Sequence, residues 1–351
     1  MLPGRKPLRH LRLLSLAVAA TAALALASCA TAAPPAGDDV DVPRAEEGAF
    51  PVTIEHAFGE TTITEQPERV ASVAWANHEV PLALGIVPVI QEKVTWGDDD
   101  ANGILPWVED RLADLGADEP LLYDPTDGID FEAINDAAPD VILASYSGLT
   151  QEEYDTLSKI APTIAYPEVA WATSVEDMIE MNAAALGFPA EGAALIEQLG
   201  GEVEEALAAH AALDGAKVLF SYIDPADFSK IGFYTTHDTR PGFLAGIGLP
   251  LPTVVEEESA TTDAFYVEVS AEEADRFADV DVFVTYGDDA ETFIAALQAD
   301  PLLSQIPAIA EGRIAVLQNS TPLAASANPS PLSIGWGIDD YFALLSAPLA
   351  G

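Results

Sequence analysis

The feature that most constrains this chain is a long helical segment near its middle, residues 189–213. Its sequence is PAEGAALIEQLGGEVEEALAAHAAL. Pro189 suits a first helical position, and Glu191 lies where the positive end of the helix dipole favours an anion. Residues that favour a buried face recur at steps of three and four: Ile196, Leu199, Val203, Leu207 and His210. A helix of about 25 residues spans roughly 37 Å, about the width of a small lobe.

Strand and helix patterns alternate on both sides of this segment. Strands are expected at residues 69–75, 87–90, 139–145, 163–166, 217–223, 281–286 and 314–317. Helices are expected at residues 77–84, 152–160, 174–186, 242–247 and 333–346. The alternation predicts an α/β fold of two Rossmann-like lobes with mainly parallel sheets, residues 50–188 and 214–351. We therefore expect the segment 189–213 to be a linking helix between the lobes, with a possible kink at Gly200-Gly201.

Two short echoes between the halves indicate an internal duplication. Residues 82–88 (LALGIVP) resemble 244–250 (LAGIGLP), and residues 140–146 (DVILASY) resemble 281–286 (DVFVTY). In parallel α/β sheets, ligands bind beyond the carboxyl ends of the strands. The loops after residues 74, 144, 223 and 285 are therefore expected to line a ligand cleft between the lobes.

The first 28 residues have the pattern of a secretory signal, with a basic start and an apolar run over residues 13–27. The ending Leu-Ala-Ser-Cys resembles a bacterial lipobox, which predicts lipidation of Cys29; the alternative is an ordinary signal with an incidental cysteine. Residues 29–49, rich in Ala, Pro, Asp and Glu, are expected to be a flexible spacer. The expected location is the outer face of the cytoplasmic membrane, lipid-anchored and extracytoplasmic.

The chain is strongly acidic. It has 14 Lys and Arg against 58 Asp and Glu, a formal charge of −44. Such a charge repels nucleic acid, so no nucleic-acid partner is expected. The simplest interpretation of this negative charge is a solvated surface that keeps the protein soluble in a salty exterior.

No enzyme or metal motif has the context that its chemistry needs. Residues 98–109 match the EF-hand calcium pattern, but Pro106 interrupts the loop and no helix precedes it, which favours an acidic loop. The four histidines after the signal lack metal-ligand spacing, and the Gly-x-Ser-x-Gly elbow is absent. We expect no catalytic residue, no metal site and no cofactor, although an enzyme with an acidic site stays open.

Aromatic and polar residues follow several of the expected strands. Flat aromatic faces with a few hydrogen-bonding groups suit a bulky, partly apolar small molecule. Arg240 either takes an anionic group of the ligand or pairs with Asp238. The residues expected to bind ligand are Trp75, Trp96, Trp107, Tyr146, Tyr222, Tyr234, Arg240, Tyr286 and, from the resemblance described next, Asn328.

From residue 58 to the end, the chain resembles the substrate-binding lipoproteins of iron–siderophore ABC importers. The motifs are PERVASV (67–73), LGIVPV (84–89), FEAINDAAPDVI (131–142), YSGLTQEEY (146–154), LSKIAPT (157–163), DAFY (263–266) and IPAIAEGRI (306–314). The resemblance implies two α/β lobes joined by one long helix, a monomer with little hinge motion, and a last cleft loop at residues 328–331. It also implies that Glu132 and Glu272, one on each lobe, dock on arginines of the permease.

The resemblance predicts capture of a ferric siderophore and its delivery to an ABC permease. The iron arrives chelated in the ligand, so the protein need not coordinate it. A neutral or cationic ferric hydroxamate suits so acidic a chain better than a catecholate. The alternatives are the same fold binding cobalamin or haem, an extracytoplasmic enzyme, and a structural surface lipoprotein.

Overall fold

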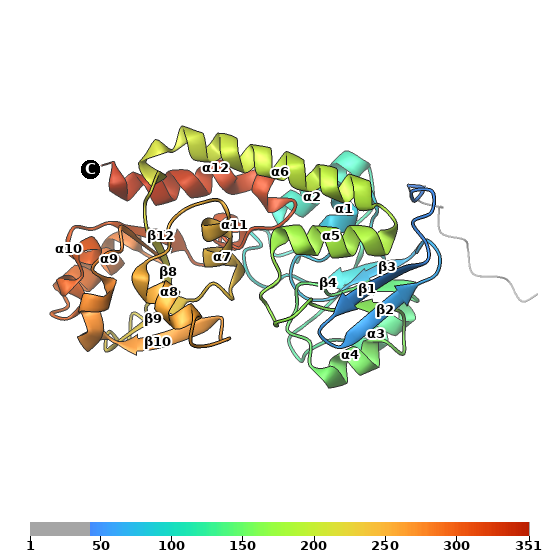
Figure 1. Ribbon diagram of the computed structural model, residues 1–351, viewed down its shortest axis with the longest axis horizontal. Helices are drawn as coiled ribbons and strands as arrows, with labels where there is room; N and C mark the ends of the chain where they lie inside the picture. The colour runs from blue at the N-terminus through green and yellow to red at the C-terminus, as the bar shows by residue number, and fades with distance from the viewer. Residues whose placement is uncertain (1–42, 351) are drawn as a thin grey trace, which may run out of the picture. The chain divides into compact units, whose positions relative to one another are not determined.

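The computed structural model describes residues 43–350. The expected signal sequence, the lipidation residue Cys29 and spacer residues 29–42 lie outside these residues. The described part holds two five-stranded sheets, one on each side of a long helix, and a small hairpin (Figure 1). The hairpin pairs β1 (Val52–His56) with β2 (Gly59–Ile63) in antiparallel register. No helix within residues 43–350 is both long and apolar enough to span a membrane.

The first sheet is parallel throughout, in the order β5-β4-β3-β6-β7. Its strands are β3 (Val70–Ser72), β4 (Ile90–Glu92), β5 (Leu121–Tyr123), β6 (Val141–Leu143) and β7 (Thr163–Ile164). Its helices are α1 (Glu79–Ala83), α2 (Pro106–Leu115), α3 (Phe131–Asp136), α4 (Gln151–Leu157) and α5 (Val175–Leu186). Thr150 and Glu153 form a capping box at α4, and Ser174 caps α5. These caps fix the helix starts close to where the sequence places them.

The second sheet has the order β10-β9-β8-β11-β12 and is mixed. Its strands are β8 (Val218–Tyr222), β9 (Lys230–Tyr234), β10 (Tyr266–Ser270), β11 (Val282–Gly287) and β12 (Ile314–Gln318). β8, β11 and β12 are parallel, whereas β9 is antiparallel to both β8 and β10. Residues 223–229, which connect β8 to β9, are too few for a crossover helix, so the chain turns back as a hairpin. This half of the sheet differs from the mainly parallel arrangement that the sequence predicts.

Helices and helical turns cover the second sheet. They are α7 (Thr239–Gly246), α8 (Thr253–Ser259), η2 (Ala271–Phe277), α9 (Ala290–Ala299), η3 (Leu303–Gln305), α10 (Pro307–Ala310), α11 (Pro322–Ser326), α12 (Ser333–Ser346) and η4 (Ala347–Leu349).

The parallel strands of the two sheets have corresponding positions. β6 and β11 hold the same place in their sheets, next to β3 and β8 respectively. The Asp140 carboxylate accepts the backbone N–H of Arg69 just before β3, at 3.0 Å. In the same way the Asp281 carboxylate accepts the N–H of Lys217 just before β8, at 2.9 Å. These matching contacts agree with the duplication that the sequence echoes indicate.

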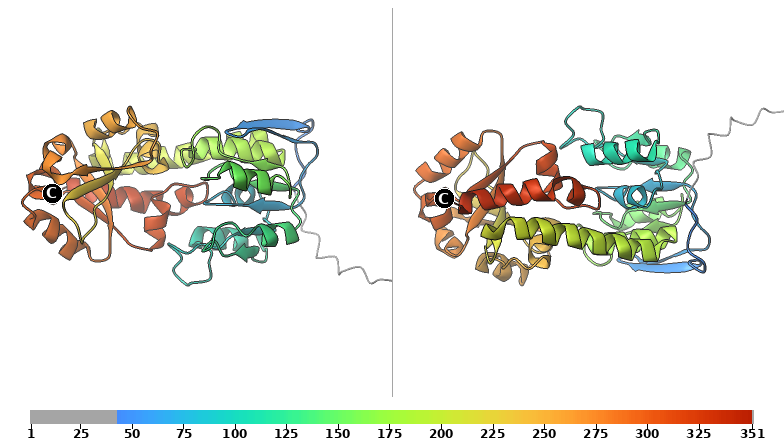
Figure 2. Two further views of the ribbon diagram at one scale, coloured as in Figure 1. Left: turned by 90° about the horizontal axis from the view of Figure 1, so that it is seen from below. Right: turned by 90° about the horizontal axis from the view of Figure 1, so that it is seen from above.

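The linking helix α6 runs from Pro189 to Ala209, and the turn η1 (Ala211–Leu213) follows it. It passes through the two glycines at 200–201 without a break. Glu46 accepts the N–H of Ala190 at 2.6 Å, which satisfies a free donor at the helix start. α6 packs against α5 of the first lobe and α12, and Figure 2 shows α6 and α12 side by side.

One apolar core crosses from lobe to lobe. It contains Ile179 from α5, Val203 from α6, Phe220 from β8, Val284 from β11 and Phe342 from α12. Because interiors are close-packed, moving one lobe against the other disturbs these contacts. The joint between the lobes is therefore a packed interface as well as a single helix.

Candidate functional site

A cavity of about 520 Å³ lies between the lobes at the carboxyl ends of the first sheet's strands. Such a volume is within the usual range for small-molecule sites. Loops after β3, β4, β5 and β6 line it from the first lobe. Its principal lining residues are Trp75, Glu92, Tyr146, Gly148, Glu153, Trp171, Asp238, Arg240, Phe265 and Asn328. The cleft is thus where parallel α/β sheets place their ligands.

The loop after β3 is held in an unusual conformation. Ala74 and Ala76 have φ angles of 64° and 61°, values that L residues seldom adopt. Buried Asn77 stabilises it by donating to the carbonyl oxygens of Val73 at 2.8 Å and Tyr146 at 2.9 Å. Asn77 also accepts the N–H of Tyr146 at 3.1 Å. The strained loop and the loop after β6 are therefore fixed to each other, a feature typical of binding sites.

Three side chains close the back of the cleft in a ring of hydrogen bonds. The Thr239 hydroxyl donates to Asn328 Oδ1 at 2.6 Å, and Asn328 Nδ2 donates to the Tyr146 hydroxyl at 3.2 Å. Since the Thr239 proton is used, Tyr146 donates to Thr239 Oγ1 at 2.8 Å. Burial raises the pKa of Tyr146, so its hydroxyl stays protonated. The ring joins the first lobe to α7 and to the loop before α12.

Arg240 is held on the second lobe by a carboxylate and two aromatic rings. It donates to both oxygens of buried Asp238 at 2.7 Å and to the Tyr286 hydroxyl at 3.2 Å. Its guanidinium carbon lies 3.7 Å from the centroid of the Tyr234 ring. Burial alone lowers the pKa of Arg240, but the Asp238 pair outweighs it and the pKa is raised. Arg240 is therefore charged and locally neutralised, with two of its five N–H donors left for a ligand.

Two tryptophans give the cleft aromatic walls. Trp75 is half-buried, and its buried Nε1 has no hydrogen-bond partner within residues 43–350. Trp171 packs edge-on against Tyr146, with ring centroids 5.4 Å apart. A Cβ at Gly148 would lie 2.1 Å from Trp171 Nε1, so only glycine lets this ring pack so close to the loop. Phe265, 44% exposed, lies at the mouth.

The charge of the cleft is negative. Its ionisable lining residues are the carboxyl groups of Glu92, Glu153 and Asp238 and the guanidinium of Arg240. Burial raises the pKa of Glu92, which also accepts the Tyr123 hydroxyl at 3.1 Å. A cleft with more carboxylates than cations disfavours an anionic ligand.

The structure brings four of the nine residues that the sequence predicts to bind ligand to the cleft wall. Trp75, Tyr146, Arg240 and Asn328 line the cleft. Trp96 lines a side cavity of about 110 Å³ that shares Trp75 and Glu92 with the cleft. Their contact with a ligand stays a prediction.

Besides Trp96, four of the predicted residues lie outside the cleft lining. Tyr234 and Tyr286 contact Arg240, so they hold the guanidinium in place. Trp107 is 3% exposed and donates to Glu79 at 2.8 Å inside the first lobe. Tyr222, at the end of β8, is 43% exposed.

The polar groups of the acidic loop at residues 98–109 form hydrogen bonds with one another. The Asp98 carboxylate accepts the N–H groups of Asp100, Ala101 and Gly103, which lowers its pKa although partial burial opposes this. Asn102 donates to Glu109. Within residues 43–350, no three His, Cys, Asp or Glu side chains form a group suited to a metal ion.

Glu132 and Glu272 occupy similar places on the two lobes. Each is exposed in the first turn of a short helix, α3 and η2 respectively. Asp130 and Ser270 cap these turns. Both carboxylates are thus free to meet a partner, and their docking role stays a prediction.

Sequence reasoning missed several lining residues. Trp171 lies in a loop with no periodic pattern, and its φ of 64° has no sequence signal. Glu92, which lines the cleft, ends β4 and resembles an ordinary polar position. Asn77 and Thr239 do not line the cleft, but their hydrogen bonds hold its loops. Asp238 was recognised only as a partner for Arg240.

Comparisons with known proteins agree with this architecture. The pattern of a family described as periplasmic binding protein matches residues 70–321. The crystal structure of Streptococcus pneumoniae TIGR4 PiaA in complex with ferrichrome is similar at 46% identity and a TM-score of 0.80, covering 85% of this chain and 98% of that chain. A periplasmic solute binding protein from Mycobacterium smegmatis is similar at 26% identity and a TM-score of 0.67, covering 85% and 98%.

Staphylococcus aureus SirA, complexed with staphyloferrin B, shares the fold at 19% identity and a TM-score of 0.63, covering 84% of this chain and 98% of that chain. No curated protein matches the chain in sequence. The family pattern covers more than half of the chain, and the likeness to PiaA extends over almost all the described residues. The chain therefore belongs to the periplasmic binding protein family.

Proposed function

We propose that this protein is an extracytoplasmic solute-binding lipoprotein that captures a ferric siderophore and delivers it to an ABC permease. The observation that carries the proposal is the 46% identity to PiaA, whose structure contains ferrichrome. A second structure describes PiaA as an iron uptake ABC transporter substrate-binding protein. The iron enters as part of the ligand, so the protein binds and releases it without catalysing a reaction.

The charge of the cleft supports a hydroxamate ligand. Ferrichrome is a hydroxamate, a class that binds ferric iron without a large net negative charge. The one cleft cation, Arg240, is already paired with Asp238, and two further carboxylates face the ligand. A ferric catecholate, which is strongly anionic, would meet repulsion here. The aromatic faces of Trp75 and Trp171 suit the apolar surface of a bulky chelate.

The anchoring and docking parts of the proposal rest on the sequence and on exposure. Cys29 would carry the lipid and residues 29–42 would act as the tether. The spacer expected at residues 29–49 is too long at its end, because Ala45 and Glu46 are hydrogen-bonded to the first lobe and to the start of α6. Glu132 and Glu272, exposed on separate lobes, would pair with basic residues of the permease. The protein would act as a monomer, because each docking acid belongs to a different lobe of one chain.

A titration monitored by tryptophan fluorescence tests the ligand class. Ferrichrome should quench the emission at stoichiometric amounts, because Trp75 and Trp171 lie at the cleft. Iron-free ferrichrome, a ferric catecholate, haem and cobalamin are the comparison ligands. Tighter binding of a catecholate, haem or cobalamin than of every hydroxamate would contradict the proposal. Recovery of the ligand unchanged after long incubation would separate a binder from an enzyme.

A further inference from the structure

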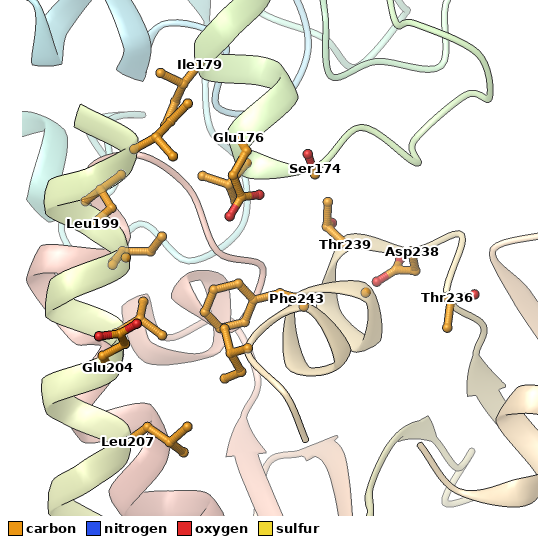
Figure 3. A pocket seen from close by; sticks show the side chains of 18 of the residues that line it. Ser174, Glu176, Ile179, Leu199, Glu204, Leu207, Thr236, Asp238, Thr239 and Phe243 are labelled. Carbon is orange, nitrogen blue, oxygen red and sulfur yellow. The ribbon is translucent and has the colours of Figure 1, made fainter. Parts of the chain in front are cut away.

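A second, larger cavity of about 600 Å³ lies beside the linking helix. It is bounded by α5, α6 and α7, so it touches both lobes and their joint (Figure 3). Most of its wall is apolar: Val175, Ile179, Ile196, Leu199, Val203, Leu207, Phe243, Ile247 and Ile334. Asp238 lines both this cavity and the ligand cleft. The two cavities are thus separated by the start of α7.

The charged residues of this wall are all acidic. Glu176 on α5 and Glu204 on α6 are exposed at the wall, and no ion pair within residues 43–350 involves either. None of the lining residues is Lys, Arg or His. The ring of Phe243 projects into the space between α5 and α6 (Figure 3). An aromatic face with carboxylates on either side attracts a cation and repels an anion.

We propose that this cavity is a second small-molecule site, which takes a hydrophobic organic cation such as an aryl-alkyl or alkyl ammonium ion. The apolar wall receives the hydrocarbon part of the ligand. The Phe243 ring and the two glutamates receive its ammonium group. The net charge of −44 raises the local concentration of cations around the chain. The site is distinct from the siderophore cleft and does not depend on what the cleft binds.

Two glycines provide a way to fill the cavity. A Cβ at Gly200 or Gly246 would meet no heavy atom within 4 Å, and both glycines line the cavity. A Cβ at Gly201 also meets no atom within 4 Å, but Gly201 does not line the cavity. Gly200→Leu and Gly201→Leu therefore form a matched pair on one helix, of which only the first occupies the cavity.

Isothermal titration of the purified protein with three compounds of one skeleton tests the proposal. The probes are 4-phenylbutylammonium, neutral 4-phenylbutanol and anionic 4-phenylbutyrate, and no siderophore is present. The cation should bind about five- to tenfold more tightly than the alcohol, and the carboxylate should bind most weakly. The preference should shrink in high salt, because the glutamates are exposed.

Variants locate the binding. Gly200→Leu should abolish binding of the cation, whereas Gly201→Leu should leave this binding unchanged. The two variants should have the same thermal stability as each other. Glu176→Gln with Glu204→Gln should remove most of the preference for the cation over the alcohol and leave only the part that the Phe243 ring contributes. Equal binding of all three probes, no binding, or binding that Gly200→Leu leaves intact would overturn the proposal. Because ferrichrome binding is measured separately, failure here leaves the proposed function untouched, and the reverse also holds.

Discussion

Gly148→Ala is the sharpest single perturbation of the cleft. The new Cβ would lie 2.1 Å from Trp171 Nε1, 2.7 Å from Cε2 and 3.0 Å from Cδ1. Ordinary contacts between such atoms are about 3.5 Å or longer, so the indole must move by more than about 1 Å. Gly148 does not have the positive φ that favours glycine. The change therefore acts on the ring and leaves the local backbone conformation acceptable.

The cost can be worked from the contacts of the ring. Trp171 packs edge-on against Tyr146, and such an aromatic pair contributes about 0.5–1.5 kcal/mol. We expect the free energy of unfolding to fall by about 1 kcal/mol. If Trp171 forms a wall for the ligand, its displacement should weaken ferrichrome binding by about 1–2 kcal/mol, a roughly five- to thirtyfold rise in Kd.

Fluorescence titration with ferrichrome measures the change in Kd, and urea denaturation measures the change in stability. Gly201→Ala, whose Cβ meets no atom within 4 Å, is the control and should bind normally. In a Trp171→Ala background, Gly148→Ala should have almost no further effect on binding, because the residue it displaces is gone. An unchanged Kd for Gly148→Ala alone would refute the assignment of Trp171 to the binding wall.

Four further predictions concern buried polar groups of the two lobes. Thr239→Val should lower the free energy of unfolding by about 1–3 kcal/mol in urea denaturation, since it leaves buried hydrogen-bonding groups without a partner. Arg240→Leu should lower the free energy of unfolding by about 3 kcal/mol, because it leaves the 4%-exposed Asp238 unpaired. Arg240→Leu with Asp238→Asn should recover most of that stability. Failure of the double variant to recover it would show that the guanidinium acts mainly through its aromatic contacts. Burial raises the pKa of Glu79 from 4.5 to about 7, so its contribution to stability is present below pH 4.5 and is lost as the pH rises to 7. The free energy of unfolding of Glu79→Gln, relative to that of wild type, should therefore rise by about 2 kcal/mol between pH 5 and pH 7.5. Burial lowers the pKa of neighbouring His78 to about 4, so its contribution to stability is lost as the pH falls from 6.5 to 4. His78→Gln should remove this loss of stability at low pH.

The parts of the fold that follow from periodic burial could be predicted from the sequence. The linking helix begins at Pro189 as expected and the closing helix spans 333–346 as expected. His210, expected on the buried face, instead ends the helix and bonds to Asp339 at 3.0 Å. The sheet topology was less accessible, because β9 and β10 are not among the strands expected from the sequence, although Asp224-Pro225 is a turn signal between β8 and β9.

The candidate site shows the same division. Tyr146, Arg240 and Asn328 follow strands or a matching motif, so pattern alone locates them near the cleft. The position of Trp171 and the hydrogen bonds among Tyr146, Thr239 and Asn328 depend on loop conformation, which hydrophobic periodicity does not encode. Trp107 has the same residue type and setting as Trp96, yet it is buried against Glu79 because α2 turns it into the lobe. Residue type near a strand end therefore predicts the neighbourhood of a ligand, whereas contact requires the backbone path.

The packing around the joint indicates how this protein responds to a ligand. The core that contains Ile179, Val203 and Val284 is continuous across the lobes, and the ring made by Tyr146, Thr239 and Asn328 fastens them at the back of the cleft. A large rotation of the lobes would break these hydrogen bonds and expose part of this core, at a cost of roughly 25 cal/mol for each Å² of apolar surface. The cavity beside α6 leaves space between α5, α6 and α7 into which side chains can adjust. Capture is therefore expected to proceed by adjustment of loops and side chains around a nearly fixed pair of lobes.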